Sequence, residues 1–173
     1  MISSLKTNLI TGLKTSPLHG TIFSLSLFII FAAIAMTIGF NVGLLESGLL
    51  KSDLIYILPI ALFIVPSLLE ETIFRGLLIP NDTYLKGSIA VTKRSIISSI
   101  IFVLWHPLTA LTINPLAKPF FLDPWFLFIV FLLGMVCSLG YIFSRSLWVP
   151  VIMHWLTVVV WVLFLGGHNI ILK

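Results

Sequence analysis

The sequence has little charge. Only 9% of its 173 residues are charged, whereas 59% are hydrophobic. An ordinary soluble domain has about 25% charged residues, so a soluble fold of this composition would have too little polar surface to stay in solution. We therefore expect an integral, multi-pass membrane protein, which a prokaryotic source would place in the cell membrane.

Other features are also scarce or missing. The single cysteine, Cys137, cannot form an internal disulfide and lies in an apolar run, where a thiol usually serves as a small packing group. No basic cluster is interleaved with exposed aromatic residues, so we expect no nucleic-acid partner. The net charge of +4 suits basic loops beside an anionic lipid leaflet.

Long apolar runs dominate the rest of the chain and predict an all-α bundle of about five transmembrane helices. The second run contains Pro59 and Pro66, which we expect to bend it. Polar residues at 80–94 predict a loop. Prolines and polar residues at 109–124 predict a loop or a re-entrant segment. The expected spans are residues 21–45, 54–79, 95–108, 125–143 and 147–165.

Residues 1–20 are too polar for a span and lack the pattern of a signal peptide. Apolar residues recur there at helical spacing, which indicates an amphipathic helix on the membrane surface. A disordered leader is the alternative. The sequence shows no internal repeat or linker, so we expect one membrane domain over residues 21–173, with the motif-bearing core at 54–165.

Basic residues in the loops predict the orientation, because Lys and Arg concentrate on the cytoplasmic side. With five spans, six basic residues fall on the side of the amino terminus and three on the other side. We therefore expect a cytoplasmic amino terminus. The two sets are Lys6, Lys14, Lys86, Lys93, Arg94 and Arg145, and Lys51, Lys118 and Lys173.

Three charged residues interrupt the second run: Glu70, Glu71 and Arg75. A charge near the bilayer centre costs several kcal/mol and usually serves a function. Glu71 and Arg75 are four residues apart, so they share a helix face and can form an ion pair. Glu70 lies about 100° round the helix from Glu71, so it can point into a cavity instead.

Two histidines fall at the depth of these carboxylates. From the cytoplasmic ends of their spans, Glu70, His106 and His154 lie about 15, 18 and 12 Å deep, at 1.5 Å per residue. Groups on three helices within one layer are expected to meet in a single cavity. Phe102 lies one turn before His106 and should place an aromatic ring beside the imidazole.

These residues carry a family resemblance. The motifs are EExxxR at 70–75, FxxxH at 102–106, and a histidine at 154 that follows the segment SLWVP at 146–150. In order and spacing they resemble the CPBP family, the CAAX-protease and bacteriocin-processing proteins, also called the Abi family. The resemblance covers roughly residues 54–165.

The resemblance implies a glutamate-dependent intramembrane endopeptidase related to the type II CAAX prenyl proteases. Glu70 would activate the attacking water with help from His106, and Arg75 would anchor Glu71 in the same polar network. His154 would stabilise the oxyanion. The resemblance implies no cofactor and no metal. The implied partner is a peptide or membrane-protein substrate, prenylated or not.

The sequence departs from the family at one position. An asparagine often follows the third motif's histidine by four residues, and Val158 stands there instead. An oxyanion donor is then either missing or supplied by Thr157, Asn114 or the backbone.

Other interpretations of the same residues stay open. Glu71 and Arg75 can form a purely structural ion pair, and the histidines can be hydrogen-bonded packing groups. The glutamates and histidines are also plausible zinc ligands of a metal-dependent hydrolase, although no HExxH motif is present. A non-enzymatic membrane protein, such as an immunity factor, a scaffold or a proton-coupled transporter component, is another possibility. The tryptophans fit interface anchors or packing groups, at Trp105, Trp125, Trp148, Trp155 and Trp161.

Overall fold

The computed structural model describes residues 2–15, 18 and 20–167, so Lys173, which the orientation prediction counts, lies outside the described residues. The described chain is helical apart from turns, loops and one isolated β-bridge, which confirms the all-α prediction. Three helices are long and apolar enough to cross a membrane. They are α2 (Thr21–Asn41), α5 (Ser88–Thr112) and α7 (Pro124–Ser144).

The predicted spans agree with the structure where an apolar run is long and unbroken. Helices α2 and α7 fall within or close to the runs at 21–45 and 125–143. Helix α8 (Trp148–Phe164) occupies the fifth run, but its 17 residues make it shorter than the three long helices. The structure therefore shows three candidate spans, at the first, third and fourth predicted runs, and the second and fifth predicted spans remain predictions.

The third predicted span was too short. We expected a helix over 95–108 after a polar loop, but α5 has 25 residues and begins at Ser88. Its first turns contain Lys93 and Arg94, which are exposed. Charged residues are good helix formers when they face water or lipid headgroups, so their polarity did not mark the end of the helix. The polar loop is reduced to a turn and the short helix η4 (Thr83–Lys86).

The second predicted span is not one continuous α-helix. Val65 has extended backbone angles (φ −131°, ψ 117°) just before Pro66, so the helix is interrupted there. Pro66 confirms the expected bend, whereas Pro59 lies in the first turn of α3, where a proline fits without a kink. The pieces are η1 (Asp53–Tyr56), α3 (Leu58–Leu62), the π-helical η2 (Phe63–Leu68), α4 (Leu69–Glu71) and the π-helical η3 (Thr72–Leu77).

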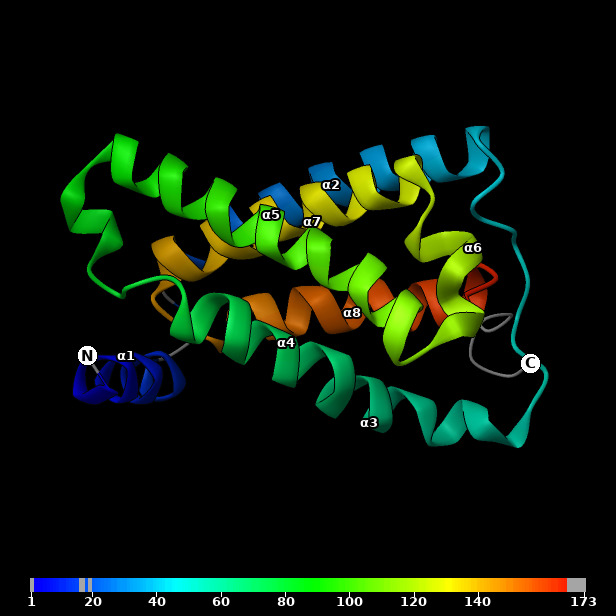
Figure 1. The fold of residues 1–173 in the computed structure, drawn as a ribbon, viewed down its shortest axis with the longest axis horizontal. Helices are drawn as coiled ribbons and strands as arrows, with labels where there is room; N and C mark the ends of the chain where they lie inside the picture. The colour runs from blue at the N-terminus through cyan, green and yellow to red at the C-terminus, as the bar shows by residue number, and fades with distance from the viewer. Residues whose placement is uncertain (1, 16–17, 19, 168–173) are drawn as a thin grey trace.

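Helix α8 lies in the middle of the bundle (Figure 1). The segment from α3 to η3 packs on one side of it, and α7 and α2 pack on the other, with α5 against α7. Close approach of α5 and α7 depends on Gly134, because a Cβ there would lie 3.0 Å from the Ser99 side chain. The central position of α8 brings His154 next to the interrupted segment.

The link between α5 and α7 is partly helical. It contains η5 (Pro115–Ala117) and α6 (Lys118–Phe121), in place of the predicted loop or re-entrant segment. Asp123 ends the link by capping α7, because its side chain accepts hydrogen bonds from the Trp125 and Phe126 backbone amides. This link places Phe121 over the imidazole of His106.

The amino-terminal segment forms helix α1 (Ile2–Lys14), as the amphipathic pattern predicted. It packs against the end of η3 (Figure 1). The Asn8 amide donates hydrogen bonds to the carbonyl oxygens of Gly76 (2.9 Å) and Ile79 (2.8 Å). The carboxyl end of α1 meets the start of α8, where the Trp148 indole donates to the Leu13 carbonyl. Helix α1 therefore joins the two segments that carry Glu70 and His154.

Candidate active site

The two neighbouring glutamates occupy α4, a single turn that follows the kink at Val65 and precedes the π-helical η3. Wide turns of this kind occur often at functional sites, because they change the direction of the side chains around them. Glu71 is fully buried, whereas the Glu70 side chain is 14% exposed. As expected, the two carboxylates point in different directions: Glu71 faces the protein interior and Glu70 lines a cavity.

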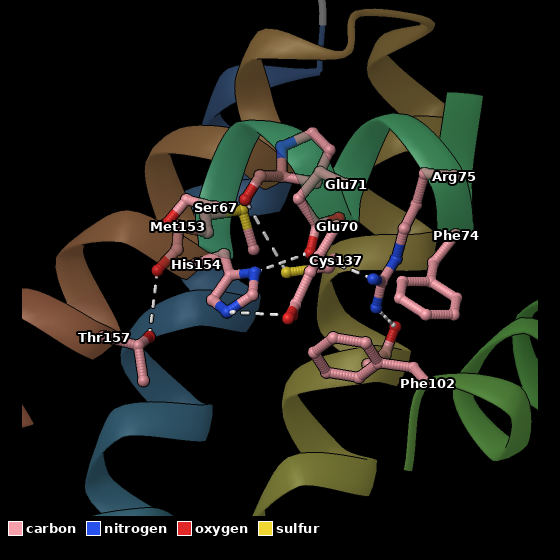
Figure 2. Close-up of polar contacts among 12 residues, drawn as sticks. Ser67, Glu70, Glu71, Phe74, Arg75, Phe102, Cys137, Met153, His154 and Thr157 are labelled. Carbon is pink, nitrogen blue, oxygen red and sulfur yellow. Dashed lines mark hydrogen bonds and ion pairs between the residues drawn. The ribbon is translucent and has the colours of Figure 1, made fainter. Parts of the chain in front are cut away.

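Glu71 and Arg75 form the predicted ion pair. Arg75 Nη1 lies 2.9 Å from Glu71 Oε1, and both side chains are fully buried (Figure 2). Arg75 Nη2 donates to the Gly134 carbonyl at 3.0 Å, and the guanidinium carbon lies 4.6 Å from the centre of the Phe102 ring. These contacts compensate a buried charge in three directions.

His154 also bonds to Glu71, which the sequence analysis did not foresee. Its Nδ1 lies 2.9 Å from Glu71 Oε1, and Figure 2 shows Glu71 between His154 and Arg75. An ionised carboxylate only accepts hydrogen bonds, so Nδ1 is the donor. The other ring nitrogen, Nε2, then faces Glu70 Oε2 at a distance of 4.0 Å.

Glu70 has a neutral donor on another helix. The Trp105 indole Nε1 donates to Glu70 Oε1 at 3.0 Å. The second oxygen of the carboxylate, Oε2, has no hydrogen-bond partner among the described residues. We had treated Trp105 only as a packing or interface group, and its position directly before His106 is the one sequence signal that could have drawn attention to it.

His106 is buried near the same site but makes different contacts. Its Nδ1 donates to the Phe102 carbonyl at 3.0 Å, which leaves Nε2 as an acceptor in the neutral ring. As predicted, the Phe102 ring lies beside the imidazole, with centroids 5.0 Å apart. The same ring lies 5.5 Å from His154. The described residues show no direct hydrogen bond between His106 and either glutamate.

A cavity of about 470 Å³ joins the three groups that we expected to meet at one depth. Glu70, His106 and His154 line it together. Most of the remaining wall is apolar and comes from α2, α7 and α8. Val158 and Thr157 both line the cavity, and the Thr157 hydroxyl donates to the Met153 carbonyl of its own helix.

Comparison with known families connects this geometry to a class of enzyme. A family model described as type II CAAX prenyl endopeptidase Rce1-like matches residues 52–160, more than half of the chain. The chain belongs to this family. The match to the Rce1-like family confirms the resemblance to the CAAX-protease group and implies an intramembrane protease with a peptide substrate. No curated protein and no solved structure matches the chain.

The Rce1-like segment contains all five candidate residues, Glu70, Glu71, Arg75, His106 and His154, whereas α1 precedes it. With three long apolar helices, the protein is an integral, multi-pass membrane protein. Across the described residues, no group of three or more His, Cys, Asp or Glu side chains is placed to hold a metal ion. Cys137 is buried in the core, as predicted.

Proposed function

We propose that this protein is an intramembrane endopeptidase that hydrolyses a peptide bond with a water molecule activated by Glu70. One observation carries the proposal. Glu70 lines the apolar cavity, and its Oε2 has no hydrogen-bond partner among the described residues and lies 4.0 Å from His154 Nε2. Two polar atoms at this separation can both contact one water molecule.

In the proposed reaction, the Glu70 carboxylate takes a proton from water while the water oxygen bonds to the carbonyl carbon of the substrate. The carbonyl becomes a tetrahedral oxyanion. When the intermediate collapses, the carbon–nitrogen bond breaks and Glu70 returns the proton to the leaving amine. Burial of the site in an apolar cavity strengthens each of these electrostatic contacts.

His154 is proposed to stabilise the oxyanion through Nε2. The Glu71 carboxylate accepts from Nδ1 and fixes the orientation of the ring, and Nε2 donates when both ring nitrogens carry a proton. Arg75 balances the charge of Glu71 through the buried ion pair. His106, held by the Phe102 carbonyl, can accept a hydrogen bond from water or from substrate at the same cavity.

The cavity suggests an apolar substrate segment. Its wall includes Phe28, Phe31 and Trp161, which suit apolar side chains or a lipid-modified residue. The family description names prenyl endopeptidases, but the apolar wall alone does not require a prenyl group on the substrate. Both an unmodified and a farnesylated version of one fluorescence-quenched peptide are therefore suitable probes.

Cleavage of this peptide pair by the purified protein in liposomes tests the proposal. Glu70→Ala, His106→Ala and His154→Ala should each reduce cleavage by at least 100-fold, while Glu46→Gln, outside the cavity wall, should cleave like the parent. Far-ultraviolet circular dichroism checks that each variant is folded. Parent-like cleavage by all three alanine variants would refute the proposed mechanism.

The metal-dependent alternative makes a different prediction. A hydrolase that requires a metal loses activity after dialysis against chelator and regains it when zinc is added. We expect cleavage to survive this treatment unchanged. Loss with chelator and recovery with zinc would favour the metal-dependent reaction.

A further inference from the structure

We propose that Trp105 is a positioning residue that holds one oxygen of Glu70 and so keeps the other oxygen directed at His154 Nε2. This inference rests on the proposed function of Glu70 and goes beyond it. It gives a specific part to a residue at one of the three unspecified positions of the FxxxH motif.

The hydrogen bond from Trp105 gives the two oxygens of the Glu70 carboxylate different surroundings. Trp105 Nε1 donates to Oε1 at 3.0 Å, whereas Oε2 lies 4.0 Å from His154 Nε2. A carboxylate that turns about its terminal bond exchanges its two oxygens, because that torsion is broad and nearly two-fold. A donor fixed to one oxygen defines the plane of the group, and therefore the direction in which the other oxygen meets water.

The Trp105 indole packs against aromatic residues of the core. Trp105 is partly buried and packs against Phe74, with ring centroids 6.4 Å apart, and against the core around Phe102. The cavity wall includes Glu70 and His106 but does not include Trp105. Trp105 therefore contacts the carboxylate from the protein side, where it can orient the group without touching the substrate.

The chemical nature of the donor fits this part. The two adjacent glutamates receive different partners, since Glu71 pairs with the Arg75 guanidinium and Glu70 with a neutral indole. A guanidinium bonded to Glu70 would lower the basicity of its carboxylate more than a neutral indole does. Indole is a donor only and does not titrate, so it orients the carboxylate without supplying a competing proton acceptor.

Enzyme kinetics with a matched pair of variants test the inference. Trp105→Phe removes the N–H and keeps an aromatic ring. Trp155→Phe removes a comparable bond, the 2.8 Å contact to the Pro59 carbonyl, away from Glu70. We expect Trp105→Phe to lower kcat roughly 10- to 100-fold with KM unchanged, and Trp155→Phe to leave both near the parent values. Equal kcat in the two variants, or a Trp105→Phe defect confined to KM, would overturn the proposal.

A second measurement does not depend on proteolysis. In protein labelled with ¹⁵N-tryptophan, the five indole N–H groups give resolvable resonances, and the one lost in Trp105→Phe belongs to Trp105. Glu70→Ala should move that resonance upfield in its proton shift, while the Trp155 resonance stays in place. An unmoved Trp105 resonance refutes the hydrogen bond. A moved resonance in a protein that cleaves neither peptide supports the contact and refutes the proposed protease function instead.

Discussion

Arg75 meets three different acceptors inside one buried space: a carboxylate, a backbone carbonyl and the face of an aromatic ring. Lysine could not reproduce this arrangement, because its ammonium lacks the planar fork that reaches two acceptors at once. The arrangement also ties η3 to α7 through the Gly134 carbonyl. At the scale of single residues, the site is therefore both a chemical centre and a structural junction.

Removing the Arg75 charge should destabilise the fold strongly. Arg75→Met leaves Glu71 buried beside His154 without its main counterion, and we expect a loss of about 3 kcal/mol in the free energy of unfolding. Lys86→Met breaks an ion pair of similar length with Asp82, but that pair is 55% exposed and should change stability by less than about 1 kcal/mol. Equilibrium unfolding in mixed detergent micelles measures both, and similar losses would contradict the prediction.

Replacing Val158 with a hydrogen-bond donor should increase the proposed protease activity. It lines the cavity on α8, one turn beyond His154, where family members often have an asparagine. An asparagine amide there would add a donor for the oxyanion, and one such donor is worth up to 10²–10³ in rate elsewhere. We expect Val158→Asn to raise kcat about tenfold. Val158→Leu, which adds no donor, serves as the control and should not raise it.

Among the elements, the segment from η1 to η3 departs furthest from the sequence prediction. The break at Val65 follows from Pro66, because a residue before proline prefers extended angles, but the π-helical η3 has no such local signal and lies where the segment contacts α1. A local pattern cannot contain those contacts. The long helices α2 and α7, by contrast, follow directly from uninterrupted apolar runs.

The same distinction explains how much of the site could be predicted. The Glu71–Arg75 pair follows from a spacing of four within one helix. The bonds from Trp105 to Glu70 and from His154 to Glu71 cross between helices, so they depend on how each helix is rotated about its axis. The shared depth of the three ionisable groups predicted that they meet, but not which atoms do so.

Helix α1 makes a testable contribution at this scale. Asn8→Ala leaves the Gly76 and Ile79 carbonyls without the side-chain amide, and we expect a loss of about 1–3 kcal/mol in the free energy of unfolding. Thr11→Ala is a matched control on α1, because the exposed Thr11 hydroxyl bonds only within its own helix. A stability change as small as that of the control would show that α1 does not support η3.

For the whole molecule, the distribution of basic residues predicts a cytoplasmic amino terminus. Cys137 is buried, so a single cysteine introduced at an exposed site provides a clean label. In intact bacterial spheroplasts, Lys51→Cys should react with a membrane-impermeant maleimide, and Lys86→Cys should react only after permeabilisation. The reverse pattern would place the amino terminus outside.

Helix α1 is synthesised first, but the residues that it contacts in the folded protein come later in the chain. Its partners at Gly76, Ile79 and Trp148 are made after it, and His154 follows them. A growing chain that ends before α8 has both glutamates but neither the histidine that bonds Glu71 nor the indole that fixes the end of α1. The proposed catalytic centre is therefore incomplete until α8 has left the ribosome, so under the proposed mechanism a chain that ends before α8 would not cut its neighbours in the membrane.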